Sequence, residues 1–241
     1  MSLRVLILTT ETPHHTHFVQ ELVEAGHQVA VLCEEQISVA EAYEEGPEAA
    51  RREYEQAHWF HDGVPRLSDL CPTNTAVSVN SKEALVTLKH AKSDVAISFG
   101  TRWIKDDALR LLPPQQWNLH GGDPQKYRGL DSHLWALYHD DHDSLITTVH
   151  SLAPRLDTGD IIAGSRIDVA SAPELPMLRA ANTDLATQLV MGSLAHLEAV
   201  GTVPRMPQAT LGRYYSALPQ ALWGRCTRSY VDAVSSWIGQ K

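Results

Sequence analysis

The sequence has few cysteines, little positive charge and no long apolar run. Its three cysteines, Cys33, Cys71 and Cys226, lie far apart, which argues against a disulfide scaffold or a cysteine-rich zinc site. The 20 basic residues are outnumbered by 29 acidic ones, whereas nucleic-acid-binding domains usually carry a basic face. Runs such as Val5–Leu8 and Val29–Cys33 are too short to cross a bilayer. We therefore expect neither a nucleic acid nor a membrane as partner.

The N-terminus also lacks the features of an export signal. It begins Met-Ser-Leu-Arg and leads directly into an apolar stretch typical of a strand. The expected location is therefore cytoplasmic. The chain has 241 residues, 43% of them hydrophobic, which is enough for one large domain with a sizeable core.

The loop after the first expected strand, Thr9–Pro13, contains no glycine. A dinucleotide-binding turn needs glycines there so that the backbone can approach a pyrophosphate, so an NAD or FAD site is not expected. The sequence also contains no phosphate-loop motif and no nucleophile elbow. Histidines cluster at His14, His15 and His17, but no spacing indicates a full set of zinc ligands, and no metal is expected.

Apolar runs and helical patterns alternate along most of the chain. The runs Leu3–Thr9 and Gln28–Cys33 flank a helical pattern at His17–Ala25, an order that predicts a parallel sheet. Further strands are expected at Ala76–Val79, Asp94–Phe99, Trp117–His120, Leu145–Leu152 and Asp160–Val169. Further helices are expected at Val39–Trp59, Ser81–Ala91, Lys105–Leu112, Leu130–His139 and Leu175–Val200. The predicted fold is α/β, with a Rossmann-like, mostly parallel sheet and flanking helices.

The composition changes after Pro204. The remaining residues, 205–241, include the aromatic residues Tyr214, Tyr215, Trp223, Tyr230 and Trp237. We expect residues 1–204 to form the main, catalytic domain. Residues 205–241 are expected to form a small, aromatic-rich C-terminal extension that is helical at its end.

Asn118 and His120 lie two residues apart on an expected strand, so their side chains project from the same face. Asp157 follows later, before a glycine turn and a new strand. An amide and a protonated imidazole can donate hydrogen bonds to an oxyanion, and a carboxylate can keep the imidazole charged and assist proton removal. The set suits acyl transfer to an amine. Purely structural roles for these residues are the alternative.

The stretch from Trp117 to Ile162 resembles the formyltransferase family. The family pattern is Asn-x-His, an aromatic-Arg-Gly, a helix with Trp-Ala, a strand with Thr-x-His, and an aliphatic residue followed by Asp-x-Gly. The matching segments, in order and spacing, are Asn118–His120, Tyr127–Gly129, Trp135–Ala136, Thr148–His150 and Leu156–Gly159. The broader resemblance covers roughly residues 3–204 and is greatest to the small sugar N-formyltransferases.

The resemblance implies 10-formyltetrahydrofolate as co-substrate. It implies that Asn118 and His120 polarise the formyl carbonyl and stabilise the oxyanion. Asp157 would pair with His120 and assist proton removal, and His150 would lie near this set on the substrate side.

The resemblance also implies where the folate binds. Its pteridine would lie against the segment containing Arg102, Trp103 and Ile104, with Leu152 and Leu156 on a loop that closes the other side. Core packing is the alternative for Trp103 and Ile104.

On the acceptor side we expect Thr10, in the loop after the first strand, and Asp123. Asp123 belongs to the loop Gly121–Gln125, where many family members have Pro-Ser-Leu-Leu-Pro instead. The changed loop suggests an unusual acceptor, with Asp123 as a charge partner for its amine. A turn-forming Asp-Pro pair is the alternative.

The resemblance leaves several acceptors open. An amino sugar or sugar nucleotide is the favoured small-molecule amine. The alternatives are glycinamide ribonucleotide, whose phosphate needs a loop richer in glycine than Thr10–His15, and another biosynthetic amine. Methionyl-tRNA is disfavoured by the acidic composition and the short tail. A folate-dependent deformylase, a non-catalytic folate-binding protein and a homodimeric assembly also remain open.

Overall fold

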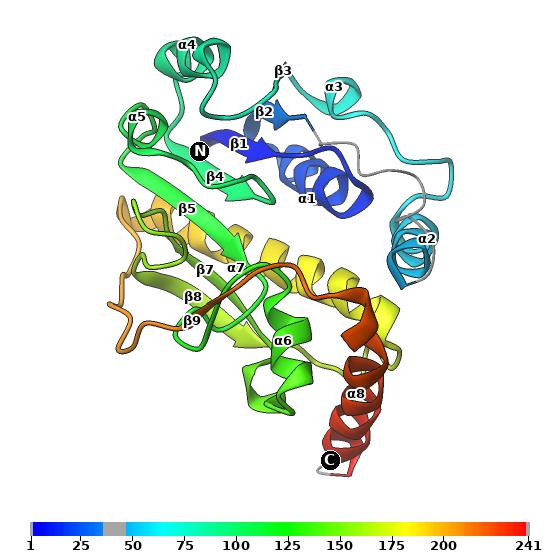
Figure 1. Ribbon diagram of the computed structural model, residues 1–241. Coiled ribbons are helices and arrows are strands. Elements are labelled where there is room, and N and C mark those ends of the chain that lie inside the picture. Colours follow the sequence, from blue (N-terminus) through cyan, green and yellow to red (C-terminus); the bar gives the residue numbers. More distant parts are fainter. Residues whose placement is uncertain (1, 36–46, 240–241) are drawn as a thin grey trace.

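The computed structural model describes residues 2–35 and 47–239, and over these ranges it contains a large sheet, a small sheet and their surrounding helices. Figure 1 shows the strands of the large sheet crossing the middle of the molecule, with α8 leading away to the C-terminus. Of the helix predicted at Val39–Trp59, residues 39–46 lie outside the described ranges.

The large sheet has the strand order β3-β2-β1-β4-β5-β7-β8 within the described residues. The strand bounds are β1 (Arg4–Thr9), β2 (Gln28–Glu34), β3 (Thr73–Ala76), β4 (Val95–Phe99), β5 (Gln115–His120), β7 (Ile146–Ser151) and β8 (Ile161–Arg166). The strands from β3 to β5 pair in parallel, whereas β7 is antiparallel to both of its neighbours. The predicted α/β fold with a mostly parallel sheet is confirmed.

Helices cover both faces of this sheet. The described helices are α1 (Pro13–Glu24), α2 (Pro47–Trp59), α3 (Leu67–Leu70), α4 (Lys82–His90), α5 (Asp106–Leu109), α6 (Ser132–Tyr138), α7 (Leu178–Val200) and α8 (Trp223–Ile238). Short 3-10 turns are η2 (His142–Ser144), η3 (Leu175–Met177) and η4 (Gln220–Leu222). Among the described helices, none combines the length and the apolar character needed to span a membrane.

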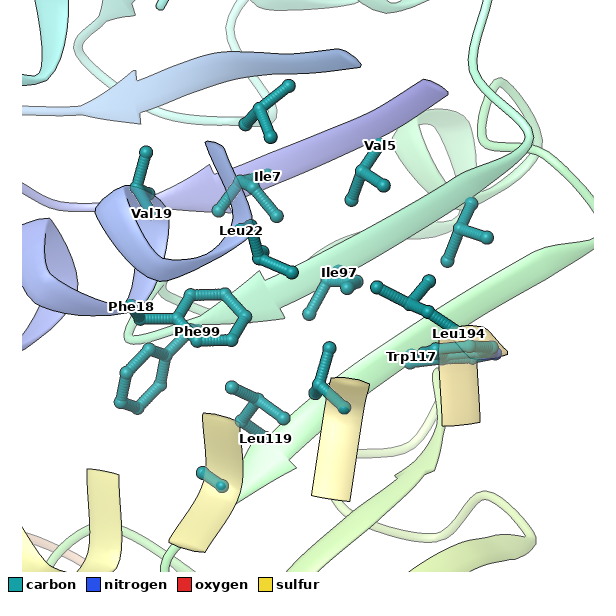
Figure 2. Packing of buried hydrophobic residues seen from close by; sticks show 14 of the residues in the cluster. Val5, Ile7, Phe18, Val19, Leu22, Ile97, Phe99, Trp117, Leu119 and Leu194 are labelled. Carbon is teal, nitrogen blue, oxygen red and sulfur yellow. The ribbon is translucent and has the colours of Figure 1, made fainter. Parts of the chain in front are cut away.

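The central strands are buried on both faces, which explains their continuous apolar sequence. Val5 and Ile7 of β1 pack in a core with α1 and α7, whereas Leu6 and Leu8 pack in a second core with α4 and α5. Figure 2 shows the first of these cores, with the side chains between the strands and the helices. Because both faces are covered, the loops at the carboxyl ends of the strands are the natural place for a ligand site.

Two predicted element bounds are wrong for identifiable reasons. The first helix begins at Pro13 rather than His17, because proline is suited to the first helical position and Thr12 before it is extended. The third strand is β3, Thr73–Ala76, rather than the apolar segment Ala76–Val79. As an edge strand it is held by backbone pairing to β2 alone, so its polar sequence carries no apolar signal.

The C-terminal segment packs closely against the preceding chain. Its strand β9 (Arg213–Tyr215) pairs in parallel with β6 (Tyr127–Gly129), forming the small sheet. Helix α8 shares a hydrophobic core with α6, in which Cys226 and Tyr230 are almost completely buried. Neither the short strands nor their pairing was predicted, and the proposed division at residue 204 remains a prediction.

Candidate active site

Strand β5 positions two of the predicted catalytic residues. Trp117 and Leu119 point into the core shared with α7, so Asn118 and His120 project together from the opposite face. On the neighbouring strand β7, His150 lies opposite Asn118 in register. The Asn118 amide nitrogen Nδ2 is 3.1 Å from Nε2 of His150.

Asp157 completes the cluster from the loop between β7 and β8. Its carboxylate oxygen Oδ2 lies 3.8 Å from Nδ1 of His120, and Oδ1 lies 3.6 Å from Nε2 of His150. Oδ2 also accepts a 2.7 Å hydrogen bond from the Gly129 amide. Asp157 has a left-handed backbone with φ of 53°, an unfavourable conformation that often marks a functional position. The structure thus brings Asn118, His120 and Asp157 together, and His150 joins them.

Backbone carbonyls orient both imidazole rings. Nε2 of His120 is 2.8 Å from the Tyr127 carbonyl, and Nδ1 of His150 is 2.8 Å from the Ser151 carbonyl. Because a carbonyl only accepts, these two ring nitrogens carry the protons. Nδ1 of a neutral His120 is therefore a free base facing Asp157. Nε2 of His150 lies within reach of both the Asn118 amide and the Asp157 carboxylate.

Burial and hydrogen bonding set the charges at the site. Burial, the largest influence on Asp157, raises its pKa, but hydrogen bonding to His150, the charges of both histidines and the Gly129 amide outweigh it and hold the pKa at about 2. Burial lowers the pKa of His120, and the nearby Asp157 charge opposes this only in part. The resting site at neutral pH therefore contains an ionised carboxylate beside a neutral His120.

All five residues predicted to contact the folate line one narrow cavity of about 40 Å³. They are Arg102, Trp103, Ile104, Leu152 and Leu156, and the same cavity reaches Asn118, His150 and Asp157. Trp103 is 54% exposed, so it is not a core residue, and its indole nitrogen donates to the Pro154 carbonyl at 3.0 Å. Ile104 is 5% exposed and does belong to a core.

A larger cavity of about 330 Å³ opens on the other side of the cluster. It shares Thr101, Asn118, Leu156 and Asp157 with the narrow cavity, so the two spaces meet at the predicted catalytic residues. Other lining side chains, which were not among the residues predicted to bind substrate, are His14, Arg51, His133, Arg179 and Asn182. Charged residues on helices give no sequence signal for such a role, because the same pattern is typical of a solvated helix face.

Two residues predicted on the acceptor side do not line either cavity. The Thr10 hydroxyl is 3.0 Å from Nδ1 of His15, and the Asp123 carboxylate accepts from the Gln125 amide at 3.0 Å. Asp123 thus stabilises its own turn. Gly122 has a direct effect on the site, because a Cβ there would lie 2.6 Å from Cβ of Ser132 and 3.1 Å from Nε2 of His120.

The C-terminal segment holds the Asp157 loop in place. The Gln208 amide donates to the carbonyls of Asp157 and Gly159, at 3.0 and 2.8 Å. Arg128 bridges the carbonyls of Leu156 and Gly212, at 3.0 and 2.6 Å. The tail beyond residue 204 therefore supports the candidate active site.

Among the described residues, no cluster of three or more His, Cys, Asp or Glu side chains is arranged to hold a metal ion.

Replacing Gly129 with alanine should damage this support. Gly129 has φ of 95°, and an added Cβ would lie 2.1 Å from the Tyr215 carbonyl oxygen. We expect a loss of roughly 2–4 kcal/mol of unfolding free energy in chemical denaturation, together with loss of activity. The control is Gly192→Ala in α7, where nothing lies within 4 Å and the fold should gain about 0.5–1 kcal/mol. Equal stability of the two variants would contradict the described contact between β6 and β9.

Comparison with known proteins identifies the family. The sequence profile described as formyl transferase matches residues 3–192, which is most of the chain. The chain therefore belongs to the formyl transferase family.

Solved structures with the same fold include three relatives at low sequence identity. An N-formyltransferase of Helicobacter canadensis, in complex with folinic acid and dTDP-3-aminofucose, is 12% identical with a TM-score of 0.60, covering 95% of this chain and 81% of that one. The formyltransferase PseJ of Anoxybacillus kamchatkensis, with a formylated UDP-sugar and tetrahydrofolate, is 18% identical with a TM-score of 0.56, covering 96% and 99%. HypX of Aquifex aeolicus, with tetrahydrofolic acid, is 17% identical with a TM-score of 0.56. The structural match to HypX covers 97% of this chain but only 34% of the HypX chain.

Proposed function

We propose that this chain transfers the formyl group of 10-formyltetrahydrofolate to the amine of an amino sugar carried on a nucleotide. The observation that supports this most is the junction of two cavities at Asn118 and Asp157. A two-substrate transfer needs such an arrangement, because donor and acceptor must reach one reacting carbon from separate sides.

In this proposal the folate binds in the narrow cavity lined by Trp103 and Leu156, and the amine enters from the larger cavity. Its nitrogen attacks the formyl carbon, and the carbonyl oxygen gains negative charge. The Asn118 amide donates a hydrogen bond to this oxygen. No nucleophilic side chain is needed, because the amine itself attacks.

Proton transfer in this proposal uses His120 and Asp157. The lowered pKa of His120 means that its imidazole is neutral before the reaction. Nδ1 of His120, which faces Asp157, takes the proton that the attacking amine loses. The ionised Asp157 stabilises the resulting imidazolium, which then protonates the folate nitrogen as the carbon–nitrogen bond to the donor breaks. His150 orients the Asn118 amide through their 3.1 Å contact.

The sugar nucleotide as acceptor is supported by the relatives. The Helicobacter and Anoxybacillus structures contain sugar nucleotides, together with folinic acid or tetrahydrofolate. A polar acceptor also agrees with the larger cavity, which is lined by Arg51, Arg179 and Asn182.

The test is to incubate the protein with 10-formyltetrahydrofolate and a panel of amino sugars, amino-sugar nucleotides and other biosynthetic amines. We expect tetrahydrofolate release together with a formylated sugar nucleotide, detected by mass spectrometry. Formylation of a different amine would support the transferase activity but would assign a different class of acceptor. Release of formate without a formylated amine would favour the deformylase. Absence of folate binding would rule out the donor.

Truncating Trp103 should weaken donor binding selectively. Its exposed indole lines the narrow cavity and is anchored to the Pro154 carbonyl. We expect Trp103→Ala to raise KM for the donor roughly 3- to 10-fold, as the loss of an aromatic contact, with KM for the acceptor unchanged. Trp103→Phe keeps an aromatic face and should have a smaller effect. A rise in acceptor KM alone would place the folate elsewhere.

A further inference from the structure

Two arginines from distant parts of the chain line the larger cavity, Arg51 on α2 and Arg179 on α7. Arg179 is paired through all three of its guanidinium nitrogens. Its Nε and one terminal nitrogen bind the two carboxylate oxygens of Glu55, at 2.5 and 3.1 Å, and its other terminal nitrogen binds Glu48. Glu55 itself is fully buried. An anionic ligand at Arg179 would therefore have to compete with two carboxylates.

Arg51 is paired much less completely. One terminal nitrogen lies 3.3 Å from Glu48, a carboxylate that Arg51 shares with Arg179. The guanidinium also stacks 4.3 Å above the Trp223 ring, which provides no hydrogen-bond acceptor. Arg51 is only 6% exposed and its Nε is buried, yet this nitrogen has no hydrogen-bond partner among the described residues. A buried donor without a partner is costly, so it is more often found where a ligand completes the pairing.

The electrostatic balance agrees with this geometry. Burial and the charge of Arg179 lower the pKa of Arg51, against the opposing influence of Glu48 and Asp131. Burial likewise lowers the pKa values of His14, His15, His120 and His133, so all four imidazoles in this cavity wall are neutral at pH 7. Of the two arginines in the described wall of the larger cavity, Arg51 is therefore the one with a nitrogen that lacks a hydrogen-bond partner.

We propose that Arg51 binds an anionic group of the acceptor, a phosphate or a carboxylate attached directly to the sugar that carries the reacting amine. The proposal deepens the proposed function and rests on it, because it takes the larger cavity as the acceptor site. A guanidinium presents its donors in a fork that matches these two anions. The volume of about 330 Å³ is near the lower end for small-molecule sites, so the anion must lie close to the amine.

The test measures binding without the folate donor. Dissociation constants are measured by titration calorimetry for glucosamine, glucosamine 1-phosphate and 2-amino-2-deoxyglucuronic acid. We expect at least one anionic sugar to bind about 10- to 100-fold more tightly than glucosamine, as expected for charged hydrogen bonds. Which of the two binds more tightly distinguishes a phosphate from a carboxylate.

Three variants assign this preference to Arg51. Arg51→Gln should reduce this preference to less than about 3-fold, since the charged hydrogen bonds that it removes account for about the same 10- to 100-fold in affinity. Arg51→Lys retains the charge and should keep part of it, which shows that the effect is not misfolding. The control, Arg228→Gln on the exposed side of α8, should keep all of it.

Several results would overturn the proposal. They are equal affinity for all three sugars, absence of anion binding, or an anion preference that survives in Arg51→Gln. Formyl transfer with an unchanged acceptor KM in Arg51→Gln would also overturn it, and would leave the proposed function intact. An Arg51-dependent preference without any formyl transfer would instead contradict the proposed function alone.

Discussion

Replacing Asp157 with asparagine is expected to lower kcat by about 10²- to 10⁴-fold, the usual contribution of a positioned acid or base. The asparagine retains the size of the side chain and an oxygen for the Gly129 amide, which donates to Asp157 at 2.7 Å. It removes the negative charge that faces His120 at 3.8 Å. Without that charge, the imidazolium that we propose to form when the amine loses its proton is no longer stabilised. The KM values of donor and acceptor should change little.

Steady-state kinetics and acid denaturation together test this expectation. The pKa of Asp157, at about 2, lies below the ordinary value of 3.8. Its ionisation therefore stabilises the fold above pH 3.8, and this contribution is lost as the pH falls toward 2. The unfolding free energy of Asp157→Asn should accordingly vary less between pH 5 and pH 2 than that of the unaltered protein. A variant that keeps full kcat would eliminate Asp157 from the chemistry.

Replacing Asn118 is expected to have the next largest effect. Loss of one donor to an oxyanion typically lowers kcat by about 10²- to 10³-fold, which is the effect expected for Asn118→Ala. Asn118→Asp is the more informative variant, because it preserves the shape of the side chain but puts a negative charge where the oxyanion forms. If Asn118 donates to the oxyanion, the aspartate should be at least as harmful as the alanine. A structural role predicts the opposite order, since the aspartate fills the same space.

The cluster of Asn118, His120 and Asp157 was predictable because it depends on local chain geometry. Asn118 and His120 share a face through the period of two of a strand, and Asp157 precedes the glycine turn of a recognisable motif. The parallel sheet was predictable for a related reason, because strands such as Val5–Leu8 are apolar throughout when both faces are buried. The five residues expected around the folate were implied by the resemblance to the family, and they do line one cavity.

The wall of the larger cavity was not predictable, because it depends on long-range packing. Arg51 and Arg179 are 128 residues apart in sequence. Arg51 lies on α2, which has the composition of a solvated surface, whereas Arg179 is an isolated charge at the start of the largely apolar α7. Their proximity follows from the packing of α2 beside the start of α7, which no short motif encodes. The pairing of β6 with β9 was missed for the same reason, since three-residue strands such as Arg213–Tyr215 carry almost no periodic signal. Thr10 and Asp123, which were predicted to lie near the acceptor, do not line the larger cavity.

The fate of the formyl carbon tests the central claim most directly. The protein would be mixed with 10-formyltetrahydrofolate isotopically labelled at that carbon and with the best acceptor from the amine panel, and the products separated after one turnover. The account predicts label in the formylated amine, and label retained in the donor when Asp157→Asn replaces the unaltered protein. Label released as free formate, or transfer that proceeds unchanged in Asp157→Asn, would contradict it.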